Sequence, residues 1–355
     1  MSKDGLAFAN AERIVQEGID DNIYSGAALG IIQAGEVVYE NYFGNVSFEE
    51  GAEPINNMTK FDLASITKIF STTSIALRFL DRGLIRLYDT VGYFFPEATT
   101  VKDITIKELM THTSGQDGSY RLSKETDDPA NVLHVVLNKE PVVERGTVRY
   151  SCMGMIILGH ILQKVSGKTL DQLFQEEVKD ILGVENVSYG PIDLTNASVA
   201  KTRDLDTAEL LQGQVHDENA RFQAGVSANA GLFSNLQDLL VYANTLLNYG
   251  DTTDGERFIS SASLDLARTN YTADQGEFRG LGFLIPIGNN SSYGDMLSEF
   301  AYGHTGFTGT SLVVDPYNDL VVVFLSNRVI SVNDGTEAIR RRALLHNSIV
   351  ADVVV

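Results

Sequence analysis

Cysteine is nearly absent from this 355-residue sequence, where it occurs once, at Cys152. An intrachain disulfide is therefore impossible, and one thiol in a chain of this length fits a reducing compartment. The chain does not need such a cross-link, because a protein of this size buries roughly three quarters of the surface that its unfolded form exposes.

Long hydrophobic runs are also missing. No stretch approaches the roughly 18 apolar residues that a membrane-spanning helix needs. The first ten residues, from Met1 to Asn10, lack the apolar core of a signal peptide. We therefore predict no membrane partner and a cytoplasmic location for this sequence.

Positive charge is scarce. The 27 lysine and arginine residues stand against 47 aspartate and glutamate residues, which leaves a net charge of −20. A field of this sign repels phosphate backbones, so we expect no nucleic-acid partner.

Several common catalytic motifs are absent too. The sequence has neither a Walker A loop nor Gly-x-Gly-x-x-Gly after a predicted strand, and 225–229 lacks the last glycine of Gly-x-Ser-x-Gly. The segment from His216 to Glu218 does not have the His-Glu-x-x-His spacing of a zinc site. We predict no metal and no cofactor.

The hydrophobic pattern predicts mixed α/β ends and a helical middle. Pairs of β-rich runs around short turn-forming loops indicate two hairpins, at 27–43 and 310–325. Helical spacing is found over 6–19, 62–80, 153–165, 170–182, 235–249 and 336–353.

This order predicts an α/β (α+β) fold, with an antiparallel sheet flanked by N- and C-terminal helices and an inserted, mainly helical lobe. We assign 1–90 and 255–355 to the α/β lobe and 91–254 to the helical lobe, with the active site between them.

The first candidate for chemistry is Ser65-Ile-Thr-Lys68. A serine hydroxyl needs a base nearby, and a spacing of three residues puts Ser65 and Lys68 on one helix face. The same spacing recurs at Ser198 and Lys201, in a polar stretch with no apolar helix after it, and we interpret that match as chance.

Two further segments gain meaning beside the first. Tyr150-Ser-Cys152 precedes an apolar helix, and a tyrosine can relay a proton when cations lower its pKa. Three glycines in Gly303-His-Thr-Gly-Phe-Thr-Gly309 indicate close approach of another backbone or a ligand at the start of a strand. Taken singly, each segment is better explained by a structural role.

In order and setting, the three segments resemble the serine β-lactamase and penicillin-binding-protein superfamily, especially its class C β-lactamase and family VIII esterase branch. That family carries Ser-x-x-Lys at a helix start, Tyr-x-Asn on a loop, and Lys-Thr-Gly or His-Thr-Gly on a strand. The resemblance covers roughly residues 10 to 350. It extends to the segments 61–70, 108–115, 215–220, 230–234 and 302–316.

The resemblance implies a role for each matching residue. Ser65 is the nucleophile, and Lys68 and Tyr150 handle its proton. The backbone N–H groups of Ser65 and Phe307 form the oxyanion hole. The substrate pocket is lined by Cys152, His304, Thr305 and Gly306. The family resemblance makes His112 and His216 structural.

Two departures from the family bear on the substrate. Cys152 stands where the family usually has asparagine, and a thiol cannot replace the amide as both donor and acceptor. His304 stands in place of lysine, so we expect a pocket without a fixed cation at neutral pH and weak recognition of substrate carboxylates.

The sequence thus predicts a serine hydrolase that acts through an acyl-enzyme on a small ester, amide or lactam. An ester is favoured, with weak β-lactamase or D-peptidase activity as a further possibility. Two alternatives stay open, namely a penicillin-binding sensor with little turnover and an acyltransferase. The oligomeric state is not predicted.

Overall fold

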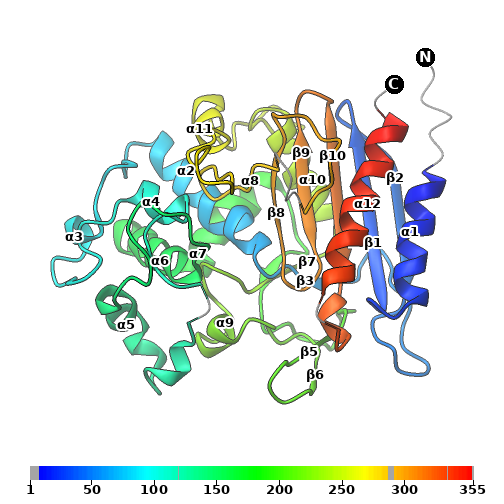
Figure 1. Cartoon of the computed structure of the whole chain (residues 1–355), viewed down its shortest axis with the longest axis horizontal. Helices are drawn as coiled ribbons and strands as arrows, with labels where there is room; N and C mark the ends of the chain where they lie inside the picture. Colours follow the sequence, from blue (N-terminus) through cyan, green and yellow to red (C-terminus); the bar gives the residue numbers. More distant parts are fainter. Residues whose placement is uncertain (1–7, 119, 287–291, 334, 354–355) are drawn as a thin grey trace.

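A five-stranded antiparallel sheet joins the two ends of the chain (Figure 1). The computed structural model describes residues 8–118, 120–286, 292–333 and 335–353. The strand order is β2 (Glu36–Gly44), β1 (Gly26–Gln33), β10 (Leu320–Ser326), β9 (Ser311–Asp315) and β8 (Tyr302–Thr305). Both predicted hairpins are present, and the pairing of β1 with β10, from Ala27 with Ser326 to Gln33 with Leu320, unites them.

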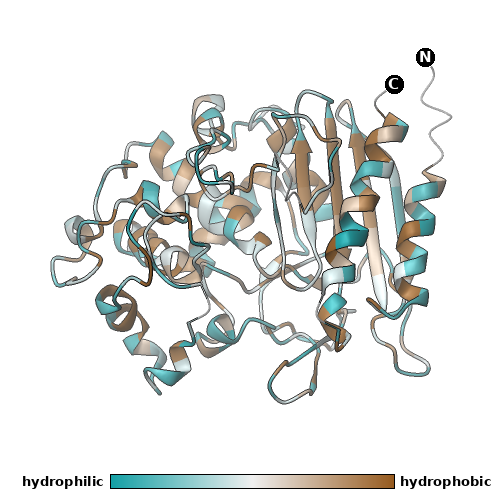
Figure 2. Ribbon diagram, in the orientation of Figure 1, coloured by the Kyte–Doolittle hydropathy of each residue, from teal (hydrophilic) through white to brown (hydrophobic). Residues whose placement is uncertain are grey.

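Helices cover both faces of this sheet. The first and last helices, α1 (Ala9–Asp20) and α12 (Thr336–Val353), pack against each other and share a core with one face of β1, where Leu29 and Ile31 point. On the other face, α10 (Leu236–Leu247) contacts β1, β9 and β10. The central strands are apolar along their length, whereas α1 and α12 alternate between apolar and polar residues (Figure 2).

Beside the sheet, α6 (Cys152–Ser166) contacts four helices, namely α3 (Val91–Phe94), α4 (Ile106–Met110), α5 (Val132–Asn138) and α7 (Leu170–Phe174). The other short helices are α8 (Asp180–Leu182), α9 (Glu218–Phe222) and α11 (Ser261–Ala267). Within the described ranges, no helix is both long and apolar enough to cross a bilayer. The predicted division into two lobes stays a prediction, and α10, which it assigns to the helical lobe, packs on the large sheet.

Two small sheets connect these layers. In the first, β3 (Phe61–Asp62), β7 (Leu232–Ser234) and β4 (Ser188–Tyr189) lie in the order β3-β7-β4. The second pairs β5 (Thr202–Arg203) with β6 (Leu210–Leu211). The first sheet fixes the chain immediately before the predicted nucleophile.

The helix predicted over 62–80 begins later than expected. Asp62 belongs to β3, and the helical path starts at Ile66, passes through a π-helical segment (Lys68–Thr73) and continues as α2 (Ser74–Asp81). Pairing with β7 holds Asp62 in a strand. Asp62 then accepts a hydrogen bond from the Ala64 N–H at 2.8 Å, and Ala64 has a φ of 46°, which no right-handed helix allows.

Candidate active site

The turn that carries Ser65 is fixed from three sides. The buried Asp62 carboxylate accepts hydrogen bonds from the N–H groups of Ala64 and His216. The N–H of Leu63 bonds to Leu232 in β7, at 2.9 Å. Because His216 and Leu232 belong to segments that are distant along the chain, the position of Ser65 depends on the tertiary structure.

Lys68 lies one turn after Ser65 and is fully buried. Its ammonium nitrogen donates to Ser65 Oγ at 2.9 Å and to the carbonyl oxygen of Asn229 at 2.7 Å. Burial acts to lower the pKa of Lys68, but its favourable interactions with Cys152, Tyr150 and Asp217 outweigh burial, so its pKa lies above the ordinary value. Lys68 is therefore charged at neutral pH.

Tyr150 reaches Ser65 from the segment before α6. Its hydroxyl donates to Ser65 Oγ at 2.8 Å, and its ring lies 5.0 Å from the Lys68 ammonium. Burial raises the pKa of Tyr150, although Lys68 opposes the effect. The structure thus brings Ser65, Lys68 and Tyr150 into mutual contact, with both partners of the serine protonated at neutral pH.

Two histidine rings lie near Tyr150. The ring centroid of His112 lies 4.6 Å from that of Tyr150, and His112 Nδ1 accepts the Ser151 N–H at 3.1 Å. On the other side, His304 Nδ1 donates to the carbonyl oxygen of Thr305 at 2.7 Å. Burial holds the pKa of both imidazoles well below the usual range, so both are neutral at pH 7.

The end of β8 is pressed against the nucleophile turn. A Cβ on Gly306 would come within 2.6 Å of the Leu63 carbonyl oxygen and would also collide with the Thr310 side chain. Glycine at this position lets the strand lie next to the serine. The prediction that the glycines mark a close backbone approach is confirmed at this position.

Phe307 follows on the exposed side of the site. Its ring lies between His216, at 5.6 Å, and the Arg328 guanidinium, at 4.5 Å. Within the described part of the chain, neither the Phe307 N–H nor the Ser65 N–H donates a hydrogen bond. Both amides are free to bind an anionic oxygen.

Cys152 begins α6 and is buried beside Lys68. Burial raises the pKa of its thiol, with Lys68 and the amide of Asn229 opposing the effect. At neutral pH the group is therefore a thiol and not a thiolate.

The pocket beside Ser65 contains positive charge that the sequence did not predict. Its volume is about 270 Å³, and it is lined by Ser65, Tyr150, His304, Thr305, Gly306, Phe307, Arg279, Arg328 and Arg342. Arg279 pairs with Glu277, whereas Arg342 has no carboxylate partner among the described residues. Burial lowers the pKa of Arg342 to about 10, which leaves it charged at pH 7.

The expected pocket without a fixed cation is therefore wrong. His304 is neutral, but three arginines from other segments, Arg279, Arg328 and Arg342, supply the charge. They escaped sequence reasoning because 279, 328 and 342 lie outside the motifs along the chain, and nothing local marks any of these residues as part of a site.

The second Ser-x-x-Lys match is not part of the site. Ser198 Oγ contacts Thr59 at 3.2 Å, and Lys201 pairs with Glu49. In the part of the chain that the structure describes, no group of three or more histidine, cysteine or acidic residues is arranged to hold a metal ion.

Comparisons with known proteins identify the family of this chain. The model of the family described as "Beta-lactamase" matches residues 11–347. The N-acetylmuramyl-L-alanine amidase of Bacillus subtilis (strain 168) is 28% identical over 348 residues, which cover 86% of this chain and 77% of the relative.

Two solved structures share the fold. EstCE1, a hydrolase with promiscuous acyltransferase activity, superposes with a TM-score of 0.75 at 22% identity, covering 96% of this chain and 98% of its own. A penicillin-binding protein homologue from Caulobacter crescentus gives a TM-score of 0.75 at 20% identity, covering 96% and 97%. The predicted fold class is confirmed by these structures.

Proposed function

Because this chain belongs to the beta-lactamase family, a family of hydrolases, we propose that it is a serine hydrolase that forms an acyl-enzyme on Ser65. One observation carries the proposal: the Lys68 ammonium and the Tyr150 hydroxyl both lie within hydrogen-bond distance of Ser65 Oγ, at 2.9 and 2.8 Å. A serine with two proton-handling groups in contact is the arrangement that nucleophilic catalysis requires.

Lys68 and Tyr150 are both protonated in the resting site, so one of them must lose a proton before it can act as a base. After Lys68 or Tyr150 loses a proton, the pair accepts the Ser65 proton as Oγ attacks the substrate carbonyl carbon. The free amides of Ser65 and Phe307 stabilise the negative oxygen that forms, and one such donor contributes about 3 kcal/mol in comparable enzymes. The proton passes to the leaving group, and water then hydrolyses the acyl-enzyme.

The two partners titrate together. Because Lys68 and Tyr150 lie close together, the apparent pKa values in the pH dependence of acylation belong to the pair and not to either residue alone.

For the substrate, we propose an ester or small amide that carries a carboxylate. Arg342 is the evidence for the carboxylate, because a buried guanidinium without a protein carboxylate partner is matched by an anion from the ligand. Cys152 supports the ester, since a thiol does not orient a substrate amide as an asparagine would.

Cys152 also supports a second candidate, the penicillin-binding sensor. If the missing amide slows the loss of the acyl group, the protein binds a lactam covalently and turns it over slowly. The two candidates therefore differ in the rate of one step, the deacylation of Ser65.

The test is intact-mass spectrometry after incubation with short p-nitrophenyl esters and with β-lactams. We expect an adduct on the wild-type chain and none on Ser65→Ala. Ser198→Ala is the matched control, because it removes the other serine of the same spacing, and it should acylate like the wild type. Adduct formation on Ser65→Ala at the wild-type rate would overturn the proposal.

The decay of the adduct then distinguishes the two candidates. Rapid loss with multiple turnover identifies the hydrolase, and a persistent adduct without steady-state turnover identifies the sensor.

A further inference from the structure

We propose that Asp217, acting through Asn229, is a positioning residue that holds Lys68 in place and keeps it protonated. The inference rests on the proposed role of Ser65 and Lys68. It adds Asp217, which does not contact Ser65 but influences the protonation of Lys68, which does.

The contacts form a short chain from the surface to the lysine. Asp217 Oδ1 accepts the Asn229 side-chain N–H at 3.1 Å, and the Asn229 carbonyl oxygen accepts the Lys68 ammonium at 2.7 Å. The other end of the Asn229 amide is also engaged, because its oxygen accepts the Ser227 hydroxyl at 2.7 Å. Asn229 is fully buried and cannot turn without breaking these bonds.

The charges around Lys68 single out Asp217. The titratable and charged groups that face the lysine are Tyr150, Cys152, His112, His304, Arg279 and Asp217. The phenol and the thiol are neutral at pH 7, because burial raises their pKa values, and both imidazoles are neutral because burial lowers theirs. Asp217 is the one anion in this set, and it favours the charged lysine.

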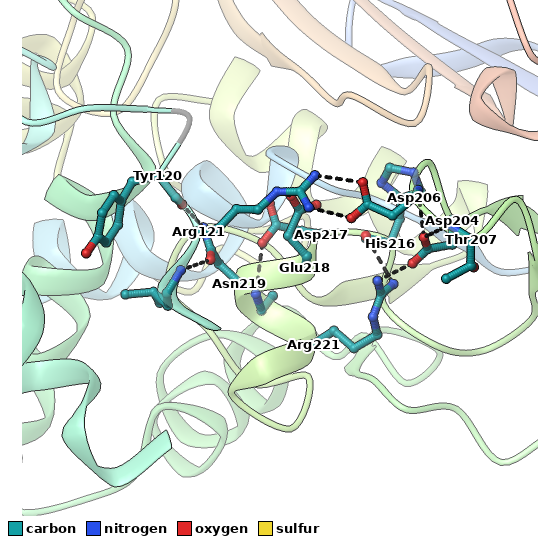
Figure 3. Close-up of polar contacts among 12 residues, drawn as sticks. Tyr120, Arg121, Asp204, Asp206, Thr207, His216, Asp217, Glu218, Asn219 and Arg221 are labelled. Atoms are coloured by element: carbon teal, nitrogen blue, oxygen red, sulfur yellow. Dashed lines mark hydrogen bonds and ion pairs between the residues drawn. The ribbon is translucent and has the colours of Figure 1, made fainter. Parts of the chain in front are cut away.

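Neighbouring acids are already paired with arginines (Figure 3). Asp206 and Glu218 both contact Arg121, and Asp204 contacts Arg221. Asp217 has no such ion pair among the described residues, although it lies in the same network. Its charge is therefore not neutralised locally.

These ion pairs also fix where Asp217 lies. Arg121 and Arg221 tie the 204–206 loop and the 120–121 segment to α9, whose N-terminus is capped by Asp217. The cap bond runs from the Ala220 N–H to Asp217 Oδ1 at 2.8 Å. The carboxylate is thus held rigidly at the end of the chain of contacts that leads to Lys68.

The test is the pH profile of kcat/KM for a p-nitrophenyl ester, measured for the wild type, Asp217→Asn and Glu218→Gln. Asn removes the charge but keeps an oxygen for both bonds, and it caps helices as well as Asp does. Without the anion the ammonium is less favoured, so the acid limb should move to lower pH by about one unit. Glu218→Gln removes the same charge one residue away and should leave the limb in place.

Asp217→Ser, which also caps helices, serves as the second variant and should give the same shift. An acid limb that stays at the wild-type pH in both Asp217 variants, or that moves as far in Glu218→Gln, overturns the inference. Either result is distinct from a failure of the proposed function, which is read from acylation of Ser65→Ala.

Discussion

Gly306 and Leu63 touch so closely that a side chain at position 306 would reach within 2.6 Å of the Leu63 carbonyl oxygen. This contact joins the last strand of the large sheet to the turn that carries Ser65. Residues almost 250 positions apart along the chain therefore determine jointly where the serine hydroxyl lies.

Gly306→Ala should displace this turn. We expect a loss of about 1–3 kcal/mol in the free energy of unfolding, as for other overpacked sites, and a fall in acylation rate of at least tenfold. Gly154→Ala, in α6, is the control, because Gly154 can accept a Cβ with no neighbouring atom closer than 3.5 Å. Thermal unfolding and adduct formation measure the two effects, and an active, stable Gly306→Ala would contradict the contact.

Arg342→Gln should weaken the recognition of substrates that carry a carboxylate. A charge-assisted hydrogen bond contributes about 1.5–3 kcal/mol, so kcat/KM for such an ester should fall about 10- to 100-fold. The value for its uncharged methyl ester should hardly change. Glutamine keeps a donor for the bond that Arg342 Nε makes to the Ser292 carbonyl oxygen, at 3.1 Å.

Arg340→Gln provides the comparison for this variant. Arg340 lies on the same helix but pairs with Glu337 at the surface, so its loss removes an equal charge outside the pocket. If Arg342→Gln and Arg340→Gln lower kcat/KM for the two esters to the same extent, the effect comes from the overall charge of the protein and not from the pocket.

Cys152→Asn should shift the preference of the site from esters toward lactams. The new amide can donate and accept a hydrogen bond where the thiol does neither well. One added hydrogen bond contributes about 1 kcal/mol, so we expect roughly a fivefold rise in the ratio of lactam to ester acylation rates. Cys152→Ser, which lacks the amide, should not change the ratio, and a rise in both variants would refute the role of the amide.

Asp62 should make stability depend on pH. Burial raises the pKa of this carboxyl to about 6, from an ordinary value of 3.8. Between these values the folded state binds the proton and the unfolded state does not, so the contribution of Asp62 to stability is largest at low pH. It falls as pH rises from about 4 to 6, by roughly 3 kcal/mol in all.

Asp62→Asn isolates this contribution. The difference in melting temperature between wild type and variant, followed from pH 4 to pH 7, should move in favour of the variant as pH rises. A difference that is flat across this range would show that Asp62 keeps an ordinary pKa.

Local pattern in the sequence was sufficient for much of this protein. The hairpins at β1–β2 and β9–β10 and the helices α6 and α12 follow from side-chain periodicity and turn residues, which act over a few positions. The three motifs around Ser65, Tyr150 and His304 were found the same way, because each is a short segment whose residues are fixed by the chain itself. Their resemblance to one family predicted that the three motifs form a single site.

Only the tertiary structure decided what surrounds the serine. The strand at Asp62 and the delayed start of the helix depend on pairing with β7, some 170 residues away. Arg279 and Arg342 enter the pocket, and Asn229 reaches Lys68, from segments that carry no local signal of a site. Charge and burial at a point in space are sums over neighbours from many segments, and a linear pattern records only the neighbours along the chain.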